Sequence, residues 1–70
     1  MSTYRYLLRA KEKVHEKVDK GYTFYVQSCI GNGPNINDIR QALKELEGEK
    51  ASIAARSTSQ FDIVKSERVN

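Results

Sequence analysis

Residues 36–47 read Ile-Asn-Asp-Ile-Arg-Gln-Ala-Leu-Lys-Glu-Leu-Glu and predict an amphipathic helix. The apolar residues recur at steps of three, four and three, which places them on one helical face: Ile36, Ile39, Leu43 and Leu46. Asn35 or Asn37 can cap the beginning of this helix, and Gly48 favours its end.

Residues 3–20, which precede this helix, also carry apolar residues at helical spacing, with charged residues between them. The apolar face would contain Tyr4, Leu7, Leu8, Val14 and Val18. Ser2 or Thr3 can cap the first turn, and Gly21 supplies a stop. The sequence therefore predicts a long N-terminal helix.

The segments that flank residues 36–47 on either side have a different character. Residues 22–30 are rich in aromatic and β-branched side chains, which favours a strand, although a short buried helix has the same composition. Residues 31–34 break any regular element. Residues 51–66 suggest a β-hairpin, with strands at 52–56 and 61–65 around a polar turn, and residues 67–70 a frayed tail.

The expected architecture is a single α+β domain over residues 1–70. It consists of a long N-terminal helix, a short strand or helix, a second helix and a C-terminal β-hairpin. The residues expected in its core are Leu7, Leu8, Val14, Val18, Phe24, Val26, Ile36, Ile39, Leu43, Leu46, Ile53, Phe61 and Ile63.

The composition limits how such a domain is stabilised. The chain has 70 residues and one cysteine, so an internal disulfide is excluded, and a second copy is a natural source of additional buried surface. We expect a cytoplasmic protein, since no apolar stretch resembles an export signal or a membrane span. The net charge of +3 permits contact with nucleic acid but does not demand it.

The sequence provides little for catalysis, so the prediction is a non-enzymatic protein without metal or cofactor. Cys29 lies in an apolar run and is expected to be a small buried hydrophobe, and His15 a half-buried packing residue. The acids between residues 38 and 49 do not have the spacing of a calcium-binding loop. The turn at residues 31–33 lacks the Gly-Lys-Ser/Thr ending of a phosphate-binding loop.

One polar sector of the helix over residues 36–47 has the composition of a nucleic-acid contact. Its side chains are of the types that pair with base edges and phosphates: Asn37, Arg40, Gln41 and Lys44. The order of a glycine turn, this helix and a hairpin, over residues 33–64, resembles the winged helix-turn-helix family. That resemblance implies a small regulatory protein that binds double-stranded DNA, with the helix in the major groove and Arg56 on the wing.

The tyrosines support an alternative function. Tyrosine is enriched at protein interfaces, and all four tyrosines lie within the first 25 residues: Tyr4, Tyr6, Tyr22 and Tyr25. A small adaptor or inhibitor that binds another protein through these rings is therefore the second prediction.

Overall fold

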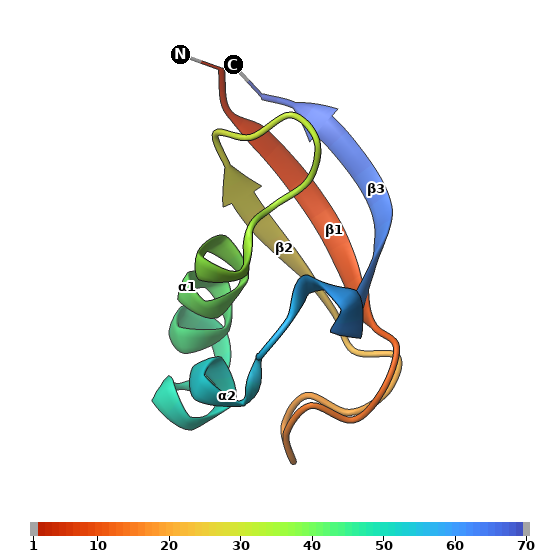
Figure 1. The fold of residues 1–70 in the computed structure, drawn as a ribbon, viewed down its shortest axis with the longest axis vertical. Coiled ribbons are helices and arrows are strands. Elements are labelled where there is room, and N and C mark those ends of the chain that lie inside the picture. Colours follow the sequence, from red (N-terminus) through yellow and green to blue (C-terminus); the bar gives the residue numbers. More distant parts are fainter. Residues whose placement is uncertain (1, 70) are drawn as a thin grey trace.

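The computed structural model describes residues 2–69 and contains a three-stranded antiparallel sheet with helices against one face (Figure 1). The strand order is β2-β1-β3, so the first strand is central. The elements follow one another as β1 (Tyr4–Ala10), β2 (Thr23–Ser28), α1 (Ile36–Glu47), α2 (Glu49–Ala54), the 3-10 helix η1 (Thr58–Gln60) and β3 (Phe61–Arg68). The predicted class of α+β is thus observed, but the predicted order of a long N-terminal helix and a C-terminal hairpin is wrong.

The predicted N-terminal helix is replaced by β1 and a connection. Tyr6, Leu8 and Ala10 are buried and alternate with the exposed residues Arg5 and Arg9, which is the period of a strand. The helical spacing that the sequence offers therefore competes with a two-residue alternation over residues 4–10. The alternation prevails because it places three side chains in a core that a sheet and two helices share.

The connection from residue 11 to residue 22 turns back on itself and returns the chain beside β1. The amides of Val14 and His15 both donate to the carbonyl oxygen of Val18, at 2.9 and 3.2 Å. Gly21, with φ of +90°, donates to the carbonyl oxygen of Ala10 at 2.9 Å. This backbone conformation favours glycine, and it brings Tyr22 into register with β1.

The helix α1 has the bounds that the sequence predicts, Ile36–Glu47. Asn35 Oδ1 accepts the amide of Asp38 at 2.9 Å, and Asp38 Oδ2 accepts the amide of Asn35 at 3.2 Å. This reciprocal pair caps the N-terminus, while Gly48, with φ of +102°, ends the helix. Ile39 and Leu43 are fully buried, whereas Leu46 is 54% exposed.

The predicted hairpin over residues 51–66 is also wrong. Residues 49–54 form α2, and the following strand β3 pairs with β1 at the other end of the chain. Ala51 and Ala55 have no exposed surface, because small side chains allow α2 and the segment after it to pack closely on the core. β3 continues to Arg68, and Val69 donates to Thr3, so the sheet extends into the segment expected to be a frayed tail.

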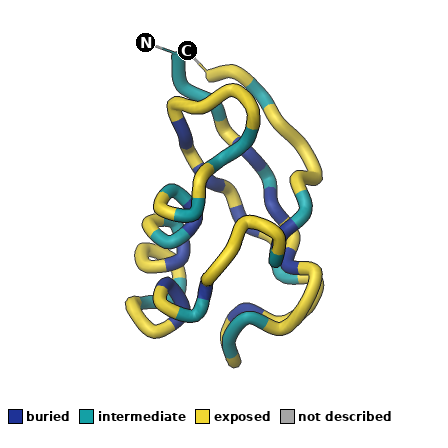
Figure 2. The backbone as a smooth tube through the Cα atoms, viewed as in Figure 1, coloured by how far each residue is buried: buried dark blue, intermediate teal, exposed yellow. Residues whose placement is uncertain are grey.

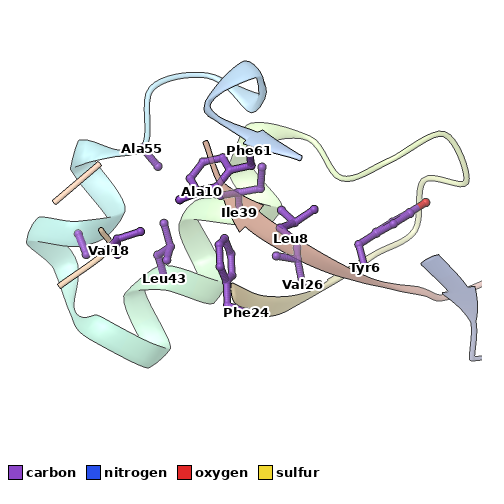
Figure 3. Close-up of a cluster of buried hydrophobic side chains, with 11 residues drawn as sticks. Tyr6, Leu8, Ala10, Val18, Phe24, Val26, Ile39, Leu43, Ala55 and Phe61 are labelled. Atoms are coloured by element: carbon purple, nitrogen blue, oxygen red, sulfur yellow. The ribbon is translucent and has the colours of Figure 1, made fainter. Parts of the chain in front are cut away.

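The core lies between the helix-facing side of the sheet and the two helices (Figures 2 and 3). Seven residues of the predicted core are buried there: Leu8, Val18, Phe24, Val26, Ile39, Leu43 and Phe61. Leu46, Ile53 and Ile63, which were also expected in it, are half exposed or more. Among residues 2–69, neither helix has the length and apolar character that a membrane crossing requires.

Candidate protein-interaction site

Successive residues of β2 direct their backbone N–H and C=O groups alternately towards β1 and away from the sheet. This alternation decides which of these groups are free. The amide of Ala10 donates to the carbonyl oxygen of Tyr22 at 2.9 Å, so this carbonyl faces β1, while the amide of Tyr22 donates to Asp19. Backbone groups that face the neighbouring strand recur at every second residue of an antiparallel ladder. Phe24 and Val26 therefore direct their N–H and C=O groups towards β1.

The residues between them face the other way. Thr23, Tyr25 and Gln27 direct their backbone donors and acceptors away from the sheet, along the outer edge of β2. All three side chains are exposed, on the face of the sheet opposite the helices. This edge is therefore able to form hydrogen bonds with a further strand.

The two edges of the sheet differ in their protection against such pairing. No charged residue occurs between Lys20 and Asp38, so β2 and both its flanks are uncharged. The opposite edge strand, β3, carries charges along its length, and its register with β1 is interrupted between Leu7 and Leu8. Charges and irregular registers are the features with which proteins prevent edge-to-edge association. β3 has both, and β2 has neither.

α1 lies beside β2 (Figure 1), and a groove runs along the edge of β2 with α1 as its second wall. It consists of two adjoining hollows of about 520 and 380 Å³, which share Tyr25, Ala42 and Glu45. The larger hollow is further lined by Arg5, Gln27, Asp38 and Gln41. The smaller one is further lined by Tyr22, Thr23, Phe24 and Leu46.

Two hydrogen bonds connect the walls of this groove, one near each end. The hydroxyl of Ser28 donates to Asp38 at 2.7 Å, and the hydroxyl of Tyr22 donates to Glu47 at 2.8 Å. The beginning of α1 thus lies at the end of β2, and the end of α1 lies at its beginning. Helix and strand run antiparallel, and their separation is held at both ends.

The environment of Tyr22 keeps its hydroxyl protonated. Partial burial, the hydrogen bond to Glu47 and the charge of that carboxylate together raise the pKa of Tyr22 to about 12. Tyr22 is therefore a constant donor across the physiological pH range.

The two ends of the groove differ in polarity. Tyr22, Phe24 and Leu46 give the smaller hollow an apolar lining, and Leu46 is 54% exposed within it. On the side of α1, Asp38 and Gln41 line the larger hollow alone, and Glu45 lines both hollows. Ala42 lies between these two groups and, as a small residue, leaves space in the middle of the groove.

On the open face of the sheet, Arg5 occupies the centre of a row across all three strands. Its guanidinium lies 5.3 Å from the centre of the Tyr25 ring, and it also donates to Glu67 of β3. Arg5 thus lines the larger hollow, and its guanidinium is paired with Glu67 on the open face.

The predicted nucleic-acid residues are distributed over several environments. Gln41 lines the groove, while Asn37 and Lys44 are exposed on α1. Arg40 is half buried and donates through Nε to the carbonyl oxygen of Ala55 at 2.8 Å. Arg56 belongs to the segment before η1, so no hairpin presents it beside α1. The helix-and-wing surface is therefore not formed, and DNA binding by this chain stays a prediction.

The four tyrosines are divided between the groove and the core. Tyr22 and Tyr25 line the groove. Tyr6 is 2% exposed, and its hydroxyl donates to Ile30 and accepts the amide of Gly33, while the ring of Tyr4 stacks on it. Of the groove residues, the sequence named Tyr22 and Tyr25 for a protein interface and Gln41 for nucleic acid, and it missed Thr23, Gln27, Ala42, Glu45 and Leu46. The uncharged run between residues 20 and 38 was a signal for Thr23 and Gln27.

The described residues contain no group of three or more potential metal ligands. Cys29 is exposed, contrary to its expected burial, because it follows the last residue of β2 at the turn away from the sheet. His15 is half buried, and its Nδ1 accepts the amide of Lys17 at 3.2 Å.

In comparisons with known proteins, this chain matches no family model, no curated protein and no solved structure.

Proposed function

We propose that this chain is a non-enzymatic protein-interaction module that adds an extended segment of a partner protein to the free edge of β2. One observation carries the proposal: an uncharged edge strand with outward backbone groups lies in a groove whose other wall is a helix. Extended peptides bind other domains in this manner, with the main chain providing affinity and side-chain pockets providing specificity.

The backbone contribution would come from Thr23, Tyr25 and Gln27, each of which has one donor and one acceptor at the edge. A net contribution of about 0.5–1.5 kcal/mol for each hydrogen bond is typical. Association costs at least about 4 kcal/mol in lost translational and rotational freedom, so backbone bonds alone give weak binding. Burial of an apolar partner side chain against Leu46 contributes about 1.5–3 kcal/mol more, which gives a dissociation constant of roughly 1 mM at the middle of these ranges.

A selection of random extended peptides against the immobilised chain tests this proposal without knowledge of the natural partner. Selected peptides are titrated into isotopically labelled protein, and we expect the amide resonances of Thr23, Tyr25 and Gln27 to shift most. A variant that carries Thr23→Lys and Gln27→Lys should lose binding, because charges on an edge strand oppose pairing.

Ser66→Lys is the matched control, since Ser66 is an exposed residue of the other edge strand. It should bind the selected peptides as well as the unmodified chain. If the peptides shift resonances of β3 instead, or bind the two variants equally, the proposed site is wrong.

A further inference from the structure

We infer that the groove selects a partner segment with one apolar and one basic side chain two residues apart, both directed towards α1. This inference rests on the proposed function and specifies the chemistry of the partner at the same site.

The spacing of two follows from the geometry of strand pairing. Partner residues opposite Thr23, Tyr25 and Gln27 direct their side chains to the open face of the sheet, as those three residues do. Partner residues opposite Phe24 and Val26 direct their side chains to the face that α1 covers. Among partner residues opposite positions 23–27, these two, which lie two residues apart, place side chains in the groove.

The position opposite Phe24 is apolar. It lies at the smaller hollow, where the apolar lining is Tyr22, Phe24, Ala42 and Leu46, and the carboxylate of Glu45 lies at the border with the larger hollow. Leu46 is 54% exposed in the free chain, although it lies on the same helix as the fully buried Leu43. An aliphatic partner side chain would cover Leu46 and occupy the space above Ala42.

The position opposite Val26 is acidic on its helical side. It lies at the larger hollow, which is lined by Asp38 from the first turn of α1 and by Glu45 from its last turn, at the border with the smaller hollow. Asp38 accepts hydrogen bonds from Ser28 and Asn35, and Glu45 accepts one from Gln41 at 3.2 Å. All three donors are neutral.

Two ion pairs that the structure shows among residues 2–69 join Arg5 to Glu67 and Lys11 to Asp62, and neither Asp38 nor Glu45 belongs to these two pairs. Arg5 lines the same hollow, but its guanidinium is paired with Glu67. A lysine or arginine on the partner would therefore be attracted by the two carboxylates, whereas an acidic residue there would be repelled.

Synthetic peptides of fixed length test the inference directly. The reference probe is a capped octapeptide with the sequence Thr-Thr-Ser-Leu-Thr-Lys-Thr-Thr, and a second probe exchanges its Leu and Lys to cover both strand directions. Dissociation constants are measured by titration of isotopically labelled chain. Replacing the peptide Leu by Ala should weaken binding about 10- to 100-fold. Replacing its Lys by Gln should weaken binding about two- to fivefold, and replacing it by Glu should weaken it further.

Variants of the chain connect each preference to one residue. Glu45→Gln preserves a side chain that can bond to Gln41 and should reduce the preference for Lys over Gln in the peptide to the part that Asp38 contributes. Glu49→Gln, which removes an exposed acid outside the groove, should leave that preference intact. Leu46→Ala should abolish the preference for Leu, and Ile53→Ala, at another exposed apolar residue, should not.

The outcomes separate this inference from the proposed function. Equal binding of the Lys and Glu peptides, with shifts at Thr23, Tyr25 and Gln27, overturns the inference and leaves strand addition intact. An absence of shifts at this edge with every peptide overturns both. Two further measurements test for other occupants of this edge. Sedimentation of the chain alone detects a second copy, and a titration with duplex DNA detects binding of nucleic acid. A dimer formed through β2, or DNA in place of peptide at this edge, also overturns the inference.

Discussion

The hydroxyl of Tyr22 donates a 2.8 Å hydrogen bond to Glu47, which connects the residue before β2 with the last residue of α1. Ser28 and Asp38 form the corresponding connection at the opposite end of the groove. Each end of the groove therefore depends on one hydroxyl and one carboxylate. This arrangement holds α1 at a fixed distance from the strand whose edge we propose to be the binding site.

Tyr22→Phe removes the first of these connections and should make folding stability less sensitive to alkaline pH. The pKa of Tyr22 is about 12 in the folded chain, above its ordinary value of 10.0. A raised pKa means that the contribution to stability is complete below pH 10 and is lost as the pH rises towards 12. Denaturant titrations at pH 8, 10 and 11 should therefore show a steeper loss of stability for the unmodified chain than for the variant.

Tyr25→Phe is the control for this measurement, because Tyr25 is 55% exposed and lies on the open face. It should retain the alkaline dependence of the unmodified chain. At pH 8 the Tyr22→Phe variant should be less stable by about 0.5–1.5 kcal/mol, the typical net value of one hydrogen bond. An unchanged alkaline slope in Tyr22→Phe would contradict the assigned contact.

Because the backbone amides of β2 face β1 and solvent alternately, we expect their hydrogen-exchange rates to alternate as well. The amides of Phe24 and Val26 bond to β1 and should exchange slowly in the free chain. The amides of Thr23, Tyr25 and Gln27 face outwards and should exchange rapidly. Hydrogen exchange followed residue by residue measures this pattern, and the opposite alternation would show that the edge presents Phe24 and Val26 instead.

Much of α1 could be predicted from the sequence, because its signals are local. Asn35, Gly48 and the spacing of Ile39 and Leu43 all concern neighbouring residues, and they fix the helix without knowledge of the rest of the fold. Phe24 and Val26 were likewise expected in the core, in a segment whose aromatic and β-branched residues favour a strand.

The rest of the fold could not be predicted, because it depends on contacts between residues that are distant in the sequence. Residues 4–10 satisfy a helical and a strand pattern at once, and only pairing with β2 and β3 decides between them. The error at the N-terminus also caused the error at the C-terminus. Without β1 as a strand, β3 had no partner except its own upstream neighbour, and a hairpin was the natural prediction. The groove could not be predicted, because it is formed by the placement of α1 relative to one edge.

The role that the sequence suggested for Arg40 differs from the contact that the structure shows, and substitution of Arg40 tests that contact. The sequence suggested a contact with bases, whereas Arg40 donates to the carbonyl oxygen of Ala55. Arg40→Met retains the length of the side chain but leaves that buried carbonyl without this donor, so stability should fall by about 1–3 kcal/mol. Lys44→Met, at an exposed position of the same helix, should change stability by less than about 0.5 kcal/mol. Thermal or denaturant unfolding of both variants measures the difference, and equal stabilities would contradict a structural role for Arg40.

Gly33, in the segment that leads into α1, should tolerate no other residue without loss of stability. Its φ of +120° is rarely adopted by residues with a side chain, and a Cβ there would lie 3.2 Å from Cδ1 of Ile63. Gly33→Ala should therefore destabilise the fold by about 1–3 kcal/mol in denaturant unfolding.

The double variant Gly33→Ala with Ile63→Val separates the two causes, because valine lacks the Cδ1 atom that the new Cβ would contact. Backbone strain would remain in this variant, whereas the steric contact would be removed. If backbone strain dominates, the double variant should be no more stable than the sum of the two single variants predicts. A recovery beyond that sum would instead assign the cost to the contact with Ile63, since coupling between substitutions reports a direct interaction.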